Sequence, residues 1–212
     1  MAQEVMITIC GCGPGAPEYI TPAVRQAVSR AEVLAGAQRL LNVFRESAAE
    51  RIVVGADTNR ALDEIAAHVE RHVVVLVTGD AGLYSFSQAV VKRFGRAACR
   101  IVPGISSVQV AFARLGLDWH DARILSAHHL TPDADLRDLT RGGKIAVLLG
   151  RKDSLTWVEE LARTLGDTYR IFIFENLTLK DERVREVVRA DLSGLNVSSL
   201  SIALLIEKGL LV

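Results

Sequence analysis

Short apolar runs alternate with amphipathic stretches through the first half of the chain. Residues 73–77 are five consecutive apolar β-formers, a run that is typical of a parallel strand buried on both faces. Apolar residues at 62, 65, 66 and 69 have the spacing of one helix face. This alternation favours a parallel sheet with crossover helices. The pattern predicts strands at 5–9, 33–35, 51–54, 73–77 and 100–102, and helices at 22–28, 38–44, 58–69, 87–94 and 105–115.

The pattern changes near residue 117. Beyond it, a strand at 144–149 and a helix at 154–165 precede three apolar runs that have few helical stretches between them. Closely spaced strands of this kind are typical of a mixed or antiparallel sheet. The sequence therefore predicts an α/β fold of two α/β domains, an N-terminal parallel-sheet domain at 1–117 and a C-terminal mixed-sheet domain at 118–212.

Composition narrows the class of protein. Half of the 212 residues are hydrophobic and 24% are charged, which suits a large core and argues against disorder. Lys plus Arg equals Asp plus Glu at 25 each, so the zero net charge argues against a nucleic-acid binder that relies on general electrostatics. No apolar run approaches the roughly 18 residues of a membrane span, and residues 1–4 lack the start of a signal peptide. We expect a cytoplasmic protein without a membrane partner.

Three cysteines give no disulfide framework. Cys10 and Cys12 form a C-x-C pair, and Cys99 is remote from them in the sequence. Zinc or iron–sulfur sites require more thiolates, or histidines at ligand spacing. The pattern favours reduced thiols packed at a strand end, and we expect no metal site.

Three loops with glycine follow apolar runs: G-C-G-P-G at 11–15, T-G-D-A-G-L-Y-S at 78–85 and V-P-G-I-S-S at 102–107. Glycine lets a backbone approach a small molecule closely, because it has no Cβ. In an open α/β sheet, ligands bind beyond the carboxyl ends of the strands. The three loops together predict the rim of one ligand cleft.

The first loop also has an alternative interpretation as a dinucleotide fingerprint. Residues 11, 13 and 16 formally fit G-x-G-x-x-[GA]. However, Pro14 and Pro17 interrupt the place where a helix N-terminus would face a pyrophosphate, and the run at 33–36 ends without an acidic residue for a ribose. A nicotinamide-dependent enzyme, or a noncatalytic ligand-binding protein, is the alternative from another functional class.

Taken together, the three loops resemble those of the tetrapyrrole (corrin/porphyrin) methylase family. That family has G-x-G-P-G in the first loop, G-D-P or a relative in the second, and P-G-I-[ST]-[SA] in the third, in this order, and the resemblance spans about residues 6–206. It implies a methyltransferase that uses S-adenosylmethionine as cofactor, bound in a cleft between the two domains. Methyl transfer from an activated sulfonium depends mainly on alignment, so no strong catalytic triad is required.

Later segments narrow the resemblance within the family. P-G-I-S-S-V-Q at 103–109, S-A-H-H at 126–129 and E-N-L-T at 175–178 are most similar to methylases that act on C5 of precorrin-6Y or cobalt-precorrin-7 in cobalamin biosynthesis. Other members of the family remain alternatives: a methylase for a different corrin carbon, for diphthamide synthesis or for ribosomal RNA. The zero net charge disfavours the RNA enzyme.

The resemblance also implies roles for individual residues. Catalytic candidates are Asp80, His128 and His129, where a neutral imidazole suits proton removal from the alkylated macrocycle. Candidate substrate contacts are Gly13, Gly15, Tyr84, Arg151 and Lys152, the last two as clamps for the carboxylates of a precorrin. Candidate cofactor contacts are Pro14, Thr78, Gly79, Asp80, Leu83, Ser106, Ser107, Ala127, Leu149, Leu177 and Ala203.

Structural roles remain open for several of these residues. Asp80 could simply close an Asx turn, and the serines at 106 and 107 could cap a helix. Each histidine could be a packed residue, and the charges at 151 and 152 could be solvated at a helix start. The chain also departs from the family pattern, with Ala16 where an aspartate often follows G-P-G, and Ala81 where a proline follows the second-loop aspartate.

Three partners are expected: the resemblance implies the substrate and a protein for the C15 half, and the sheet edges and the apolar second domain allow a homodimer. The substrate is a precorrin or cobalt-precorrin, and any cobalt would sit in the macrocycle without a protein ligand. A homodimer is expected. The C5 reaction is paired in the corrin pathway with methylation at C15 and decarboxylation, which require a second domain, so a chain of 212 residues is expected to perform the C5 half beside a separate partner protein.

Overall fold

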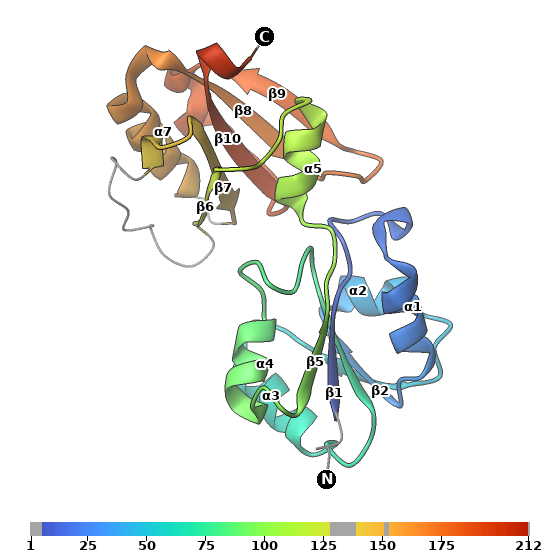
Figure 1. The fold of residues 1–212 in the computed structure, drawn as a ribbon. Coiled ribbons are helices and arrows are strands. Elements are labelled where there is room, and N and C mark those ends of the chain that lie inside the picture. Colours follow the sequence, from blue (N-terminus) through green and yellow to red (C-terminus); the bar gives the residue numbers. More distant parts are fainter. Residues whose placement is uncertain (1–5, 128–138, 151–152, 212) are drawn as a thin grey trace. The chain divides into compact units, whose positions relative to one another are not determined.

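A computed structural model describes residues 6–127, 139–150 and 153–211, and Figure 1 shows its fold. The chain forms two compact units, Met1–Ser106 and Ser107–Val212. The sequence placed the boundary at residue 117, which would leave helix α5 (Ser107–Arg114) in the first domain. In the structure α5 contacts strand β10 (Ser201–Glu207), so packing assigns this helix to the second unit.

The first unit contains a five-stranded sheet in the order β3-β2-β4-β1-β5 (Figure 1). Every neighbouring pair is parallel, as predicted. The central strand β4 coincides with the predicted run at 73–77 and is buried along its whole length. The strands are β1 (Ile7–Gly11), β2 (Val33–Gly36), β3 (Glu50–Val53), β4 (Val73–Val77) and β5 (Cys99–Val102).

Helices cover both faces of this sheet (Figure 1). Helices α1 (Pro22–Ser29) and α2 (Gln38–Val43) pack against one face, and α3 (Thr58–Ala66) and α4 (Ser87–Phe94) pack against the other. Helices α1 and α3 each begin with a side-chain cap. Thr21 Oγ1 accepts a hydrogen bond from the backbone N–H of Val24, and the Asp57 side chain accepts one from the N–H of Arg60, which satisfies donors at the starts of α1 and α3.

The second unit contains a mixed sheet in the order β6-β7-β10-β8-β9. Strands β6 and β7 are parallel, and the remaining neighbours are antiparallel, as predicted. Helix α7 (Ser154–Leu165) packs its apolar face on the sheet, and short 3₁₀ helices lie at Pro17–Tyr19, Gly166–Thr168, Arg189–Gly194 and Lys208–Leu210. The strands are β6 (Arg123–Ser126), β7 (Lys144–Leu149), β8 (Tyr169–Glu175), β9 (Arg183–Val187) and β10 (Ser201–Glu207).

The predicted burial of the C-x-C pair is confirmed. Cys10 and Cys12 are free thiols in the core of the first unit, and burial raises the pKa of each thiol to about 12. Both therefore stay protonated near neutral pH, where the thiolate is the reactive form. Within the described residues, no group of three or more His, Cys, Asp or Glu side chains is arranged to hold a metal ion.

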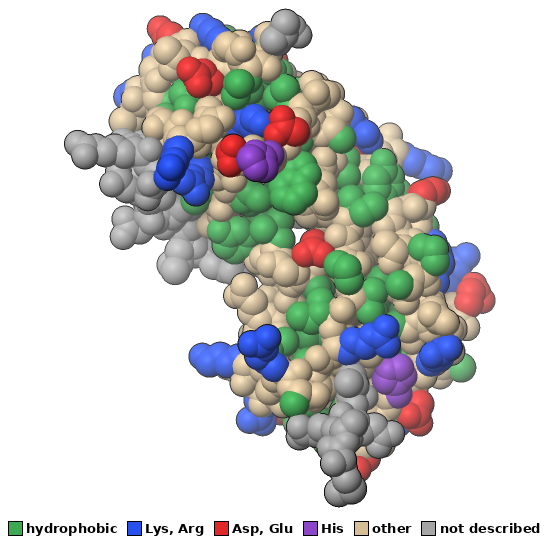
Figure 2. Space-filling view, in the orientation of Figure 1, with side chains coloured by type: hydrophobic (Ala, Val, Ile, Leu, Met, Phe, Trp, Pro, Cys, Tyr) green, Lys and Arg blue, Asp and Glu red, His purple; other side chains and the backbone are tan. Residues whose placement is uncertain are grey.

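The surface carries charges of both signs. On the face shown in Figure 2, basic and acidic side chains are interspersed, in keeping with the zero net charge. Among the described residues, none of the helices combines the length and the apolar character needed to cross a bilayer.

Candidate functional site

Strand order places the first candidate site at the carboxyl ends of β1 and β4. These strands are neighbours, but from β1 the chain crosses to β2 on one side, and from β4 it crosses to β5 on the other. Their crossover helices α1 and α4 therefore lie on opposite faces of the sheet (Figure 1). In an open α/β sheet, a point where the strand order reverses in this way is the usual place of a ligand.

Backbone hydrogen bonds join the first two glycine loops. The N–H of Gly13 donates to the carbonyl of Gly79 at 3.2 Å, and the N–H of Gly79 donates back to the carbonyl of Gly13 at 2.8 Å. Both residues have positive φ, at 77° and 69°, a region that glycine adopts without strain. The glycines are therefore required by the way in which the loops pair.

The third loop packs directly on the first two. A Cβ built on Gly11 would lie 2.6 Å from the backbone nitrogen of Gly104 and 2.8 Å from the carbonyl oxygen of Gly79. Gly104 is equally enclosed, because a Cβ there would meet the carbonyl oxygens of Gly11 and Gly79. The three loops thus converge through backbone contacts that no larger residue permits. Their predicted meeting at one edge of the sheet is confirmed, and their role as the rim of a ligand cleft stays a prediction.

Asp80 holds the second and third loops together. One carboxylate oxygen, Oδ1, accepts from the N–H of Gly82 at 2.8 Å, which forms the Asx turn considered above. The other, Oδ2, accepts from the N–H of Gly104 at 2.9 Å. Both carboxylate oxygens have structural partners, and the arrangement fits a role in shaping the loops.

Arg39 is a site residue that the sequence analysis missed. Its guanidinium Nη2 donates to Thr78 Oγ1 at 3.0 Å, across 39 residues of sequence. Burial lowers the pKa of Arg39, although a guanidinium remains charged at physiological pH. A cation in the helix that follows β2 was the available signal, because the carboxyl end of β2 lies at the same edge of the sheet.

The remaining candidates near the glycine loops belong to the first unit, except Ser107, with which the second unit begins. Tyr84 is 51% exposed and has φ of 44°, so its ring stands out from the second loop. Leu83 is half-buried and its N–H donates to the carbonyl of Asp80 at 3.2 Å. Of the others, Pro14 and Ser106 are buried, Gly15 is half-buried, and Ser107 is the first residue of α5.

The second unit gathers its candidates at one edge of the mixed sheet. The strands β6, β7 and β8 end at this edge, and β10 begins there, with Ser201 paired to both Leu149 and Glu175. Ala127, Leu149 and Leu177 follow or end these strands, and Ala203 lies two residues into β10. All four are buried. The predicted residues His128, His129, Arg151 and Lys152 lie outside the described part of the chain.

The turn after β8 has an uncommon backbone. Asn176 and Thr178 have positive φ, at 50° and 70°, and enclose the buried Leu177. The N–H of Thr178 donates to Glu182 Oε2 at 2.5 Å, and Arg114 of α5 forms a two-bonded ion pair with the same carboxylate, at 2.6 and 3.1 Å. The hydrogen bond from Arg114 lowers the pKa of Glu182 below its ordinary value. This ion pair fixes the far end of the turn.

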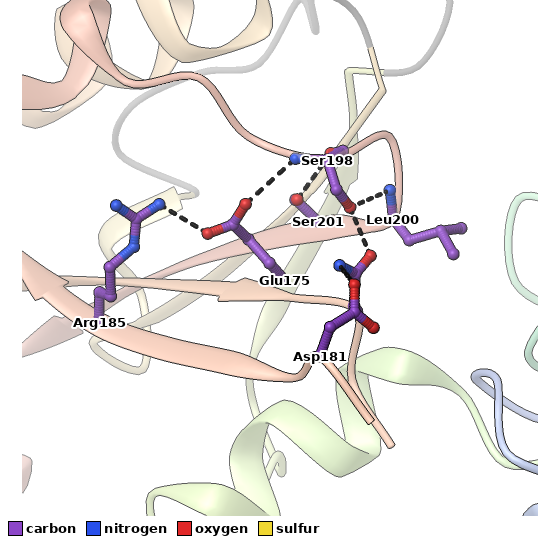
Figure 3. A network of polar contacts seen from close by, with 7 residues as sticks. Glu175, Asp181, Arg185, Ser198, Leu200 and Ser201 are labelled. Atoms are coloured by element: carbon purple, nitrogen blue, oxygen red, sulfur yellow. Dashed lines mark hydrogen bonds and ion pairs between the residues drawn. The ribbon is translucent and has the colours of Figure 1, made fainter. Parts of the chain in front are cut away.

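A polar network fixes the near end of the turn (Figure 3). It connects the end of β8 to the segment before β10. Most of its members were not recognised from the sequence, because the two contacts that join these segments span 22 and 23 residues. We call this set the β8–β10 network; it consists of Glu175, Asn176, Asp181, Arg185, Ser198 and Ser201.

Comparison with known proteins identifies the family. Residues 6–193 match the sequence profile of the Tetrapyrrole (Corrin/Porphyrin) Methylases. The chain belongs to this family. It is 34% identical, over 183 residues, to the cobalt-precorrin-7 C(5)-methyltransferase of Salmonella typhimurium, a match that covers 84% of this chain and 89% of that relative. The family predicted from the three loops is thereby confirmed.

Solved tetrapyrrole methylases share the fold. The precorrin-6Y methylase of Archaeoglobus fulgidus superposes with a TM-score of 0.75 at 25% identity, over 96% of this chain and 98% of that one. The uroporphyrin-III C-methyl transferase of Thermus thermophilus, complexed with S-adenyl homocysteine, gives a TM-score of 0.77 at 21% identity, over 94% and 91% of the two chains. The predicted two-domain α/β class is confirmed.

The dinucleotide alternative has a structural counterargument. A pyrophosphate site of that type needs the N-terminus of a helix directly after the glycines. Here Gly13 is followed by a 3₁₀ turn at Pro17–Tyr19, and α1 begins only at Pro22. The first loop instead pairs with the second through Gly13 and Gly79, which uses the backbone donor that a phosphate would require.

Proposed function

We propose that the protein transfers a methyl group from S-adenosylmethionine to C5 of a corrin precursor, precorrin-6Y or cobalt-precorrin-7, in cobalamin biosynthesis. The observation that carries the proposal is the 34% identity with the Salmonella C(5)-methyltransferase along nearly the whole of both chains. The Archaeoglobus relative, a precorrin-6Y methylase at 25% identity, supports the same substrate class.

The described residues fit S-adenosylmethionine as the methyl donor. Gly11, Gly79 and Gly104 pack backbone against backbone, which orders the three loops at the carboxyl edge of the sheet, the usual place of a ligand in an open α/β fold. Asp80 provides a negative charge that suits a sulfonium or an ammonium group. The Thermus relative was solved with S-adenyl homocysteine, the product form of this donor. In the second unit, the buried aliphatic residues Leu149 and Leu177 suit the apolar surface of an adenine ring.

In the proposed reaction, the protein acts mainly by aligning the methyl donor with the acceptor carbon. The donor supplies an electrophilic methyl group, the S–C bond breaks as the ring carbon forms its new bond, and a proton is subsequently lost from the alkylated macrocycle. The contribution of this chain is to hold donor and acceptor in line, which is worth roughly 7–11 kcal/mol in well-oriented reactions. The carboxylate of Asp80 orders the loops for this task through Gly82 and Gly104.

The first test is thermal unfolding with S-adenosylhomocysteine and, separately, with NAD. A ligand at about 100 times its Kd stabilises the folded protein by about 2.7 kcal/mol, and we expect Tm to rise by roughly 5–10 °C with S-adenosylhomocysteine. Enzymatic methylation of cobalt-precorrin-7 or precorrin-6Y should then place a ¹³C-methyl group on C5, as NMR of the product would report. A Tm shift with NAD alone, or methylation at another carbon, contradicts the proposal.

Arg39 is our candidate for a substrate carboxylate contact. The guanidinium of Arg39 hydrogen-bonds the hydroxyl of Thr78, a residue of the second glycine loop at the carboxyl edge of the first sheet. Guanidinium groups bind carboxylates with two parallel hydrogen bonds, and corrin precursors carry acetate and propionate side chains. Arg39 would act in addition to Arg151 and Lys152, the clamps expected from the sequence.

We predict that Arg39→Ala raises KM for the corrin precursor about tenfold or more, because a hydrogen bond to a charged group contributes roughly 1.5–3 kcal/mol. The Kd for S-adenosylhomocysteine and kcat should stay within about twofold of wild type, since uniform substrate binding alone is lost. Steady-state rates and calorimetry separate the two effects. Arg45→Ala is a matched control, because the Arg45 side chain is 81% exposed and pairs only with Glu46. A loss of cofactor affinity equal to the loss of substrate affinity would assign Arg39 to loop structure instead.

The proposal also includes the partner proteins of this chain and its cellular compartment. We propose a homodimer in the cytoplasm, and a separate protein that supplies the C15 methylation and decarboxylation. The Salmonella relative, covered to 89% of its length, is named for C(5) alone, which supports a division of the two methylations between proteins.

A further inference from the structure

The turn after β8 presents one residue whose polar backbone groups are unpaired. Within the described part of the chain, neither the N–H nor the C=O of Leu177 forms a hydrogen bond. Its neighbours are paired: the N–H of Asn176 donates to the carbonyl of Leu200 at 3.0 Å, and the N–H of Leu179 donates to the carbonyl of Asn176 at 2.9 Å. The turn therefore offers a donor and an acceptor at one fixed point.

The β8–β10 network begins at a buried carboxylate (Figure 3). Glu175, at the end of β8, is 4% exposed. Its Oε1 accepts from the N–H of Ser198 at 3.2 Å, and its Oε2 accepts from Arg185 Nη2 at 2.6 Å. Because a buried carboxylate needs such partners, Glu175 fixes Ser198 against the end of the strand.

Ser198 links Glu175 to the turn after β8 by hydrogen bonds (Figure 3). Its Oγ accepts from the N–H of Leu200 at 3.0 Å and donates to Asn176 Oδ1 at 2.7 Å. Asn176 Nδ2 in turn donates to Asp181 Oδ2 at 2.7 Å. The side-chain amide of Asn176 is thus held on both sides, directly before Leu177.

The hydrogen bonds of the Asn176 side chain matter because the backbone of this residue has an uncommon conformation. Its φ of 50° lies in the left-handed region, which asparagine tolerates better than most residues but which a free chain leaves readily. Two side-chain hydrogen bonds stabilise that conformation, beside the backbone hydrogen bonds of Asn176 with Leu200 and Leu179. Without the side-chain bonds, the direction of the Leu177 N–H would vary, because this N–H belongs to the peptide that joins 176 and 177, and the C=O of Leu177 in the next peptide would shift with it.

We infer that Asn176, held by Ser198 and Asp181, is a positioning residue that fixes the backbone of Leu177 for hydrogen bonding to the heteroaromatic base of the cofactor. The inference rests on the proposed function, in which Leu177 contacts the adenine of S-adenosylmethionine. A base of this kind presents a donor and an acceptor side by side, which matches an N–H and a C=O of one residue. The network therefore contributes to cofactor affinity without touching the cofactor.

Three variants test the inference by calorimetry with S-adenosylhomocysteine and by steady-state kinetics. Asn176→Ala removes both side-chain hydrogen bonds, and we expect Kd to rise about 30-fold, since each bond has a net worth of about 1 kcal/mol. Asn176→Gly should also raise Kd, because glycine allows the backbone conformation but does not select it. Ser198→Ala should raise Kd about fivefold, and Ser198→Thr, which keeps the hydroxyl, should restore affinity. KM for S-adenosylmethionine should rise with Kd, while kcat stays within about twofold.

Two controls separate positioning from stability. Thr168→Ala removes a hydroxyl hydrogen bond to the carbonyl of Leu165 at the other end of β8, and it should leave Kd unchanged. The double variant Asn176→Ala/Ser198→Ala should bind as weakly as Asn176→Ala alone, because the two side chains share one hydrogen bond.

The inference is overturned if folded Asn176→Ala and Ser198→Ala bind S-adenosylhomocysteine within twofold of wild type, or if their effects add in full. A lowered Tm with unchanged Kd, measured well below the unfolding transition, would likewise assign the network to stability alone. Failure of the wild-type protein to bind S-adenosylhomocysteine would instead overturn the proposed function. The wild-type titration therefore distinguishes the two failures.

Discussion

We expect Gly104→Ala to abolish cofactor binding and to lower the free energy of unfolding by about 3 kcal/mol, the upper part of the range for overpacked interiors. The added Cβ would meet the carbonyl oxygens of Gly11 and Gly79, which are backbone atoms of strands and loops that cannot turn away as a side chain would. For a chain of this size, that loss corresponds to a Tm lower by roughly 6–12 °C. Chemical denaturation and calorimetry with S-adenosylhomocysteine measure the two effects.

Gly55→Ala is the matched control for this prediction. A Cβ at Gly55 has nothing within 4 Å, and its backbone does not have positive φ. We expect its stability to change by no more than about 0.5 kcal/mol, as for ordinary surface substitutions. If Gly104→Ala behaved like this control, the three loops would not be packed as described, and the assignment of the glycines to backbone contact would be wrong.

Hydrophobic periodicity was sufficient to predict the fold. Strand β4 and helices α4 and α7 have the predicted bounds, because buried runs and amphipathic faces are local properties of the sequence. The position of α5 was not predictable in this way. Its apolar residues show that it packs, but not on which sheet, and the structure places it against β10 in the second unit.

The candidate site was predicted in outline only. Glycine loops after strands indicate where a ligand binds, because the carboxyl ends of parallel strands share one edge. The contacts that order the loops depend on tertiary structure. The Asp80–Gly104 hydrogen bond spans 24 residues, the Arg39–Thr78 bond 39, and the Arg114–Glu182 ion pair 68. Such pairs have no periodic signal, so sequence reasoning identified Asp80 but neither its second partner nor Arg39.

The two units order their loops by different kinds of contact. In the first unit, glycines and Asp80 fix the backbone of the loops directly, whereas in the second unit a buried carboxylate acts through Ser198 and Asn176. Neither arrangement requires a side chain that reacts. An enzyme that works mainly by alignment needs rigid loops of this kind, since misplacement of about 1 Å can cost roughly a hundredfold in rate.

We expect Asp80→Ala to weaken binding of S-adenosylhomocysteine about 100-fold. The variant leaves the N–H groups of Gly82 and Gly104 without their carboxylate partner, and hydrogen bonds to a charged group contribute roughly 1.5–3 kcal/mol each. Asp80→Asn keeps one acceptor oxygen but turns an NH₂ group toward the other N–H. Its Kd should therefore rise about tenfold. Calorimetry provides both values, and Asp63→Asn, at an exposed ion pair with Arg93, is the control.

Steady-state kinetics distinguish a structural role of Asp80 in the loops from a role as a general base. If it shapes them, Asp80→Asn at saturating S-adenosylmethionine and substrate should keep kcat within about fivefold of wild type, because the lost interaction is a ground-state one. Loss of a general base would instead lower kcat by roughly 10²–10⁴ with little change in KM. We expect the first result, since both carboxylate oxygens accept backbone N–H groups and so hold the second and third loops together. A fall in kcat of the second size would show that the carboxylate of Asp80 takes part in the reaction.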